Sequence, residues 1–125
     1  MELSGRKLTG VERAKLLAAV EALVCRRELS LGAAARVLRA SFLGMSRREY
    51  AQRVGVSDRQ LANLETDQAN PTVATLERVF GPFGLQVGLV RRYKGPIAVE
   101  IELDADELAR FAAAIHAAVA RNERG

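Results

Sequence analysis

The chain is poor in the residues on which most catalytic and metal chemistry depends. It has a single cysteine, Cys25, which excludes an internal disulfide, and a single histidine, His116. One residue of each kind, far apart in the sequence, makes neither a set of metal ligands nor a pair of nucleophile and base. No glycine-rich phosphate loop follows a predicted strand. The sequence therefore predicts no enzyme, no metal site and no cofactor.

Long apolar runs are also missing. No stretch approaches the ~18 apolar residues of a membrane-spanning helix, and no apolar run near the N-terminus resembles a signal peptide. We therefore expect a cytoplasmic protein with no membrane partner. The sequence has no low-complexity segment and no internal repeat. Its 125 residues, 49% of them hydrophobic, allow one domain with a single core and an appendage.

Acidic residues are scarce over most of the chain and gather near its end. Residues 1–96 hold 16 lysines and arginines against 9 acidic residues, a net charge of +7. Residues 97–125 hold 3 against 6, a net charge of −3. The first part suits a polyanion such as DNA, because phosphate neutralisation supplies much of the affinity for nucleic acids. The asymmetry indicates a different task for the C-terminal segment.

Apolar residues at helical spacing predict helices in the first two thirds of the chain. Thr9 and Glu12 have the spacing of a capping box at the start of the first helix, and Gly44 ends the second. The predicted helices cover residues 9–28, 31–42, 46–54, 57–65 and 72–80.

The periodicity changes after Gly84. Apolar residues recur at every second position over residues 85–90 and again over residues 97–103. A period of two is typical of strands with one buried face, and residues 91–96 form a turn between them. The two segments predict either a β-hairpin or strands that pair with a neighbouring subunit.

The most informative stretch is residues 45–67. Two short amphipathic helices meet there across a three-residue turn. Ala51 allows a close contact between them, Gly55 is free to take a positive φ angle, and Ser57 is a good N-cap for the second helix. The side chains left outward on that helix are polar: Asp58, Arg59, Gln60 and Asn63. Such side chains are what base edges in a major groove require.

A longer pattern surrounds this turn. Its members are Ser46, Glu49, Ala51, Gly55-Val56-Ser57, Leu61, Leu64-Glu65, Asn70-Pro71-Thr72, Leu76, Val79 and Phe80. In these residues the chain resembles the Xre/Cro, or lambda-repressor-like, helix-turn-helix family over residues 31–83. The resemblance implies a mainly α fold: a lambda-repressor-like helix-turn-helix bundle with a C-terminal β-hairpin, or inter-subunit strands, and a terminal helix. We expect an N-terminal helix over 1–30, the DNA-binding domain over 31–83 and a strand-strand-helix dimerisation module over 84–125.

The resemblance implies base contacts from one short helix. Ser57, Asp58, Arg59, Gln60 and Asn63 occupy its recognition positions. Arg59 can form a bidentate pair with guanine, and Gln60 or Asn63 with adenine. Asp58 either accepts from a cytosine amino group or favours the helix N-terminus electrostatically.

Other residues are expected to contact the DNA backbone. Arg47 and Arg48 lie at a helix start, where the helix dipole disfavours positive charge, which indicates that they serve phosphates. Thr66 and Gln68, in the loop after the recognition helix, are expected to donate to phosphate as well.

The family also implies two structural roles. It often pairs the residue corresponding to Glu65 with an arginine on the preceding helix, and Arg39 is the candidate here. Arg39 lies one residue further from Gly44 than the usual spacing, so Arg36 or a bent helix end are alternatives. Tyr50 replaces the usual leucine and should still fill core volume.

The last predicted helix begins at Asp104, with a capping-box spacing to Glu107. Its apolar stripe consists of Leu108, Phe111, Ala112, Ile115 and Val119. The helix either joins two subunits or covers its own hairpin. We favour the first, because helix-turn-helix proteins usually read paired half-sites as dimers. Cutting the chain after Gly84 would then leave a weak monomeric binder.

These features predict a sequence-specific DNA-binding transcriptional regulator that acts as a homodimer on double-stranded DNA. It would repress by occlusion of a promoter, with activation by contact with polymerase as the alternative sign of regulation. The alternative is an antitoxin that represses its own operon, with the acidic C-terminal segment capturing a basic toxin protein. A third hypothesis is an interaction module that has lost DNA binding, but the retained Arg59, Gln60 and Asn63 argue against it.

Overall fold

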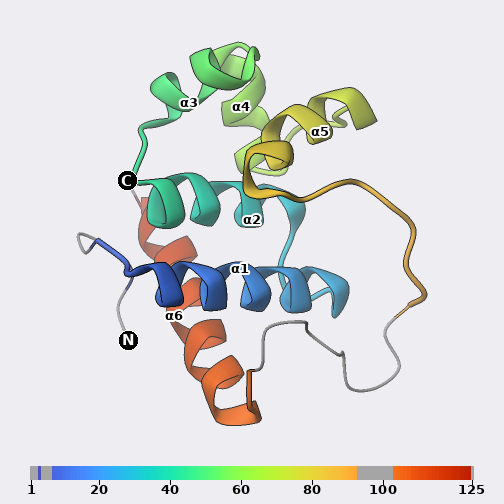
Figure 1. Ribbon diagram of the computed structural model, residues 1–125. Helices are drawn as coiled ribbons and strands as arrows, with labels where there is room; N and C mark the ends of the chain where they lie inside the picture. Colours follow the sequence, from blue (N-terminus) through green and yellow to red (C-terminus); the bar gives the residue numbers. More distant parts are fainter. Residues whose placement is uncertain (1–2, 4–6, 93–102, 125) are drawn as a thin grey trace.

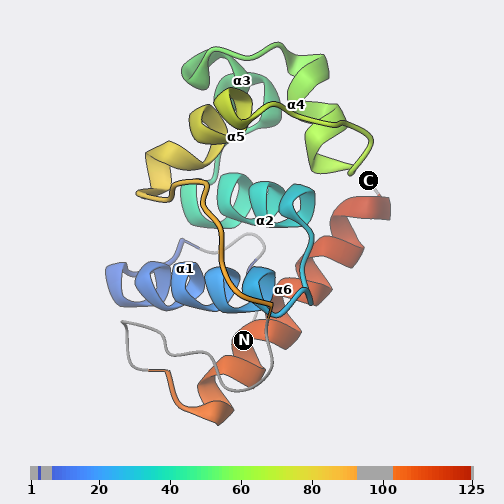
Figure 2. The ribbon, with the colours of Figure 1, turned by 90° about the vertical axis from the view of Figure 1, so that its right-hand side faces the viewer.

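The computed structural model describes residue 3, residues 7–92 and residues 103–124, and the protein is mainly helical over these ranges. Its elements are α1 (Gly10–Cys25), α2 (Leu31–Val37), η1 (Leu38–Leu43), α3 (Arg47–Val54), α4 (Asp58–Glu65), α5 (Val73–Phe80), η2 (Gly81–Phe83) and α6 (Ala105–Arg124). Figure 1 shows α3, α4 and α5 as one layer, with α2 beneath them and α1 beneath α2. Helix α6 crosses beside α1 and α2, as Figure 2 also shows.

Each of the first five α-helices begins at a serine or threonine whose hydroxyl oxygen accepts a backbone N–H from the first turn. These N-caps are Thr9, Ser30, Ser46, Ser57 and Thr72. An N-cap of this kind satisfies one of the donors that a helix start leaves unpaired. The predicted capping box of Thr9 and Glu12 is confirmed. The predicted helix starts are confirmed as well, because they depended on these local signals.

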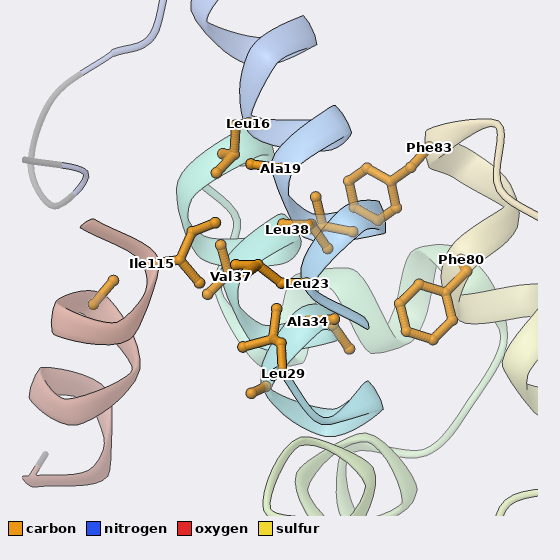
Figure 3. Close-up of a cluster of buried hydrophobic side chains, with 14 of the residues drawn as sticks. Leu16, Ala19, Leu23, Leu29, Ala34, Val37, Leu38, Phe80, Phe83 and Ile115 are labelled. Atoms are coloured by element: carbon orange, nitrogen blue, oxygen red, sulfur yellow. The ribbon is translucent and has the colours of Figure 1, made fainter. Parts of the chain in front are cut away.

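The core forms around α2, whose alanines let neighbouring helices approach closely. Ala34 and Val37 are almost fully buried, and so is Leu38 at the start of η1. Figure 3 shows these side chains between Leu16, Ala19 and Leu23 of α1, Ile115 of α6, and the rings of Phe80 and Phe83. Full burial of a leucine or isoleucine stabilises the fold by about 1.5–3 kcal/mol. The layer that holds α3 and α4 therefore rests on a core that α1, α2 and α6 share.

Helix α6 uses its apolar stripe within its own chain. Phe111 and Ile115 are buried, and Leu108, Ala112 and Val119 pack against the same core. Polar contacts add to this packing: Lys15 forms an ion pair with Glu107, and the His116 Nε2 lies 3.2 Å from the Glu28 carbonyl oxygen. The expectation that this stripe faces a second subunit is therefore wrong. Among the described elements, its partners are α1 and α2.

The predicted strand over residues 85–90 is also wrong, because the chain from Leu85 to Arg92 is irregular. Leu85 packs against the core, but Leu89 is fully exposed and Val90 is 71% exposed. A period-two pattern shows which residues share a face, whereas a strand also needs a neighbouring strand to pair with. The described residues place no strand beside this segment; its Leu85 N–H donates to the Phe80 carbonyl and its Val87 N–H to the Glu77 carboxylate. The second predicted strand, over residues 97–103, lies outside the described residues except for Leu103.

Candidate nucleic-acid interface

The turn between α3 and α4 depends on Gly55. Its φ angle is +77°, and its N–H donates to the Ala51 carbonyl at 3.0 Å. A side chain at this position would meet open space, so the requirement for glycine comes from the backbone angle and not from crowding. Arg78 of α5 donates to the Gly55 carbonyl at 3.2 Å and braces the turn from outside. Ala51, 2% exposed, lets the two helices meet closely as predicted.

Helix α4 begins with a reciprocal cap. The Gln60 N–H donates to the Ser57 hydroxyl at 3.0 Å, and the Ser57 N–H donates to the Gln60 side-chain oxygen at 2.9 Å. Gln60 therefore shapes the helix start with its oxygen, and its amide NH₂ group remains available as an outward donor. This arrangement is a capping box, and the Ser-x-x-Gln spacing is a known signal for it, but the box was not predicted.

The sequence placed Arg47 and Asp58 in separate roles, but the structure brings them together. The Arg47 Nε lies 3.2 Å from the Asp58 Oδ1, so an ion pair joins the start of α3 to the start of α4. Both side chains are about half exposed, and such pairs contribute little to stability. The pair still orients both groups. It leaves the other N–H donors of Arg47 free for a phosphate, because a guanidinium carries five.

Arg48, Arg59 and Asn63 are exposed and face outward from α3 and α4. Within the described part of the chain, their side chains make no hydrogen bond and no ion pair. These three groups, like the Gln60 NH₂ group and the remaining Arg47 donors, can therefore bind a ligand without first breaking a contact. Leu61 and Leu64, on the opposite face of α4, are buried as predicted and hold the helix against the core.

The loop after α4 directs its donors toward its own backbone. The Thr66 hydroxyl donates to the Ala62 carbonyl at 2.9 Å, and the Gln68 amide nitrogen donates to the Thr66 carbonyl at 3.3 Å. Both residues are exposed. A phosphate contact from the Thr66 hydroxyl therefore requires a rotation away from this arrangement, whereas the Gln68 amide keeps a second N–H that the bond to Thr66 does not use.

Asp67 ties the end of α4 to the start of α2. It has a φ of +56°, unusual for a residue other than glycine, and accepts from the Ser30 hydroxyl at 2.8 Å and the Gly32 N–H at 3.2 Å. A Cβ at Gly32 would lie 2.2 Å from the Leu64 carbonyl oxygen. The two helices can approach this closely only with glycine there. This junction was not predicted, because its partners are far apart along the chain.

The predicted pairing of Glu65 with Arg39 is confirmed. The Arg39 Nε and Nη2 donate to the two Glu65 oxygens at 2.7 and 2.8 Å, and Nη1 donates to the Met45 carbonyl at 2.8 Å. Arg36 stands further off, 3.8 Å from the same carboxylate. Glu65 is only 5% exposed, and a bidentate arginine provides the compensation that a buried carboxylate needs.

The one-residue shift of Arg39 has a structural explanation in η1. This element, Leu38–Leu43, is a π-helical turn whose bonds run from residue i to residue i+5, and it ends at Gly44 with a φ of +67°. A π turn holds one residue more than an α turn. The extra residue is absorbed there, so Arg39 reaches Glu65 although it lies one place further from Gly44.

Tyr50 joins α3 to α5. Its ring is 1% exposed, so the prediction that it fills core volume is confirmed, and its hydroxyl donates to the Val79 carbonyl at 2.6 Å. Burial, and then the negative charge of Glu65, raise the pKa of Tyr50 to about 12. The hydroxyl therefore stays protonated and keeps its hydrogen bond well above neutral pH.

Other kinds of site find no support in the described ranges. They hold no group of three or more histidine, cysteine, aspartate or glutamate side chains placed to bind a metal ion. None of their helices combines the length and the apolar character needed to cross a membrane.

Comparison with protein families matches residues 43–88 to the helix-turn-helix family. This range holds α3, the Gly55 turn, α4, α5 and η2, and it includes every side chain predicted to contact DNA. It is less than half of the chain, and α1, α2 and α6 lie outside it. Neither the curated proteins nor the solved structures give a match.

Proposed function

We propose that the protein is a sequence-specific DNA-binding regulator of transcription, and that residues 43–88, which match the helix-turn-helix family, are its lambda-repressor-like (Xre) DNA-binding unit. The observation that carries the proposal is the outward face of α4. Arg59 and Asn63 are exposed there without competing contacts, on a helix whose two ends are held by the Ser57 cap and by Asp67. A rigid helix with free polar side chains is what readout of base edges requires.

The proposed mechanism is insertion of α4 into the major groove. Arg59 would pair with a guanine, while Asn63, or Gln60 through its amide, would contact an adenine. Arg48 would meet a phosphate directly, and Arg47 would do so beside Asp58, which it orients. Ser57, Thr66 and Gln68 would add weaker backbone contacts. Phosphate contacts fix the position of the protein on DNA, and base contacts specify the sequence.

We further propose that the protein acts in the cytoplasm as a homodimeric repressor. Helix-turn-helix dimers bind half-sites about one DNA turn, ~34 Å, apart. A dimer on such a site would cover promoter DNA and repress by occlusion. The net charge of +7 on residues 1–96 supports this proposal, since it suits phosphate contacts from each subunit.

A selection from a random pool of duplex DNA tests the proposal. The expected result is an enriched motif that contains two related half-sites and that binds at least about a thousandfold more tightly than random duplex. Equal affinity for all sequences, falling with salt to the same degree, would leave only non-specific binding. A variant with Arg59, Asn63 and Gln60 all changed to alanine is the matched control, and it should select no motif.

The acidic C-terminal segment is the observation that supports the antitoxin alternative. Residues 97–125 carry a net charge of −3, and Asp104 and Asp106 are exposed at the start of α6. A basic partner would be attracted to such a surface. Expression of the reading frame next to this gene decides between the two functions. Toxicity that this chain neutralises by forming a stoichiometric complex would favour the antitoxin.

A further inference from the structure

A groove opens on one side of the bundle, between the helices and the segment that follows η2. Helices α1, α2 and α5 and residues 85–92 form its walls, and its volume is about 600 Å³, within the range of small-molecule sites. Figure 1 shows the segment standing off at one edge of the bundle, and Figure 2 shows it crossing in front of α2 and α1. No residue of α3 or α4 lines the groove, so it is separate from the proposed DNA interface.

The floor of the groove is apolar. Its side chains come from three helices: Val20 and Val24 of α1, Ala34 of α2, and Leu76 and Phe80 of α5. Two large apolar side chains of the walls remain partly open to water, Leu31 at 45% and Val87 at 38% exposure. Removal of such surface from water is favourable and needs no particular direction of approach, so the floor suits the apolar body of a ligand.

Three arginines line the same groove: Arg27, Arg91 and Arg92. All three are exposed, and their side chains make no hydrogen bond or ion pair with any residue that the structure describes. Glu21 is the only acidic residue among the described residues of the walls. In Figures 1 and 2 the last described residues of the segment lie near the C-terminal end of α1, which Arg27 follows closely. The groove therefore combines an apolar floor with an excess of positive charge toward one end.

Arg27 holds a backbone position that glycine usually occupies. Its φ is +60°, in the left-handed region, where a side chain other than glycine is strained. The residue ends α1: its N–H donates to the Val24 carbonyl at 3.0 Å, and the Glu28 N–H donates to the Leu23 carbonyl at 2.9 Å. Strained backbone of this kind is common where side chains hold a ligand, and here the strained residue lines the groove.

We propose that this groove binds a small amphipathic organic anion. The apolar body of the ligand lies on the floor formed by α1, α2 and α5, and its carboxylate is held by Arg27, Arg91 and Arg92. A guanidinium group binds a carboxylate through two parallel hydrogen bonds, which fixes the orientation of the ligand as well as its charge. A phosphate of DNA would also suit the three arginines, but it would leave the apolar floor unused. The site does not depend on the proposed function.

Isothermal titration calorimetry of the full-length chain with decanoate tests the class of ligand. Decyltrimethylammonium has the same alkyl chain and the opposite charge, so it should bind at least about tenfold more weakly than decanoate. Equal affinity for the two compounds would overturn the proposal, because the arginines would then play no part in binding.

Two triple variants test the arginines at equal net charge. Changing Arg27, Arg91 and Arg92 to glutamine should weaken decanoate binding at least about tenfold. The control changes three arginines that are exposed and do not line the groove: Arg53, Arg110 and Arg121. This control should bind decanoate within about twofold of the parent, because only distant charges are lost. Equal loss in the two variants would reduce the effect to net charge and overturn the site.

Leu31 and Val73 provide a matched pair for the apolar wall. Each is the exposed first residue of its helix, directly after the Ser30 or Thr72 N-cap, but only Leu31 lines the groove. Aspartate is favourable at a helix start, so both aspartate variants should keep the helical circular dichroism of the parent. Leu31→Asp should weaken decanoate binding at least about tenfold, because it places a carboxylate beside the bound anion. Val73→Asp should leave the affinity unchanged. A Leu31→Asp variant that binds like the parent would contradict the proposal.

Cys25 reports where the ligand binds. It is the only cysteine of the chain, and it lines the groove. Saturating decanoate should slow the reaction of its thiol with methyl methanethiosulfonate at least about fivefold, because only the unoccupied fraction reacts. An unchanged rate with decanoate bound would place the ligand elsewhere and overturn the proposal. A parent that binds no decanoate, while the groove arginines prove necessary for affinity to random duplex DNA, would assign these arginines to phosphates instead.

Discussion

Arg59 and Arg48 are both exposed arginines on short helices, but they are expected to act differently. Arg59→Ala should lose about 1–3 kcal/mol of specific binding and relax the preference at one base pair, because it removes a bidentate contact. Arg48→Ala should weaken binding to all sequences alike and lower the salt slope by about one unit. Fluorescence anisotropy on the selected operator and on random duplex, at several salt concentrations, separates the two effects. An Arg59→Ala variant with unchanged selectivity would remove that residue from the readout.

Tyr50 should make stability sensitive to alkaline pH. The pKa of its hydroxyl is about 12 in the folded protein, against an ordinary value of 10.0. A raised folded-state pKa contributes stability that is fully present below pH 10 and is lost as the pH rises through 12. The shift corresponds to about 2–3 kcal/mol at most. Urea unfolding at pH 7 to 11.5 should therefore show a steep loss of stability above pH 10.

Tyr50→Phe is the control for this pH dependence. It removes the titrating group and leaves the Val79 carbonyl without its donor, so it should cost about 1 kcal/mol at neutral pH. Its stability should fall less steeply than that of the parent above pH 10. Parallel pH curves for the two proteins would assign the alkaline loss to other groups.

Glycine is required for different reasons at two junctions between helices: for lack of space at Gly32 and for a positive φ angle at Gly55. Gly32→Ala should destabilise the fold by about 3 kcal/mol, because its Cβ would meet the Leu64 carbonyl oxygen and the Asp67 carboxylate. Gly55→Ala should cost only about 1 kcal/mol, since the site is open and only the positive φ is unfavourable. Gly10→Ala, at an open position with no such angle, is the reference. Chemical denaturation of the three variants should rank them in this order.

Sequence signals were sufficient to predict α3, the Gly55 turn and α4, because these elements depend on residues that are close along the chain. Serine caps, the Gly55 turn and the spacing of Leu61 and Leu64 act within a few residues. The Asp67 junction escaped prediction for the opposite reason, because its partner Gly32 lies 35 residues away, in α2. The π turn was approached only through the alternative of a bent helix end before Gly44. The role of Arg39 was predicted only through the family resemblance, and the sequence showed no reason for its displaced position.

For the molecule as a whole, apolar periodicity identified the faces that are buried but not what buries them. Phe111 and Ile115 were expected against a second subunit and lie against α1 and α2 instead. Leu89 and Val90 were expected in a strand and are exposed on irregular backbone. Both errors have one origin, since a period reports a shared face and carries no information about the partner.

The place of α6 changes the expected result of truncation. Cutting the chain after Gly84 was expected to leave a monomeric DNA-binding domain. Because α6 covers the side of the core that holds Leu16, Leu23 and Val37, the shortened chain would instead expose these residues to water. It should lose its cooperative thermal transition in circular dichroism. A shortened chain that unfolds as sharply as the parent would show that α6 is dispensable for the core.

The π turn of η1 should allow this protein to lose one residue from a helical segment without unfolding. Removing one residue from an α-helix rotates everything beyond it by about 100°, which misplaces every later contact. Here the turn already holds one residue too many, so deletion of Ser41 should convert it to an α turn and leave both flanking helices in register. We expect the deletion variant to keep the contact of Arg39 with Glu65 and to unfold within about 1 kcal/mol of the parent. Deletion of Ala18, in the middle of α1, should abolish folding. A one-residue deletion that abolishes folding in α1 would thus leave the free energy of unfolding nearly unchanged at Ser41.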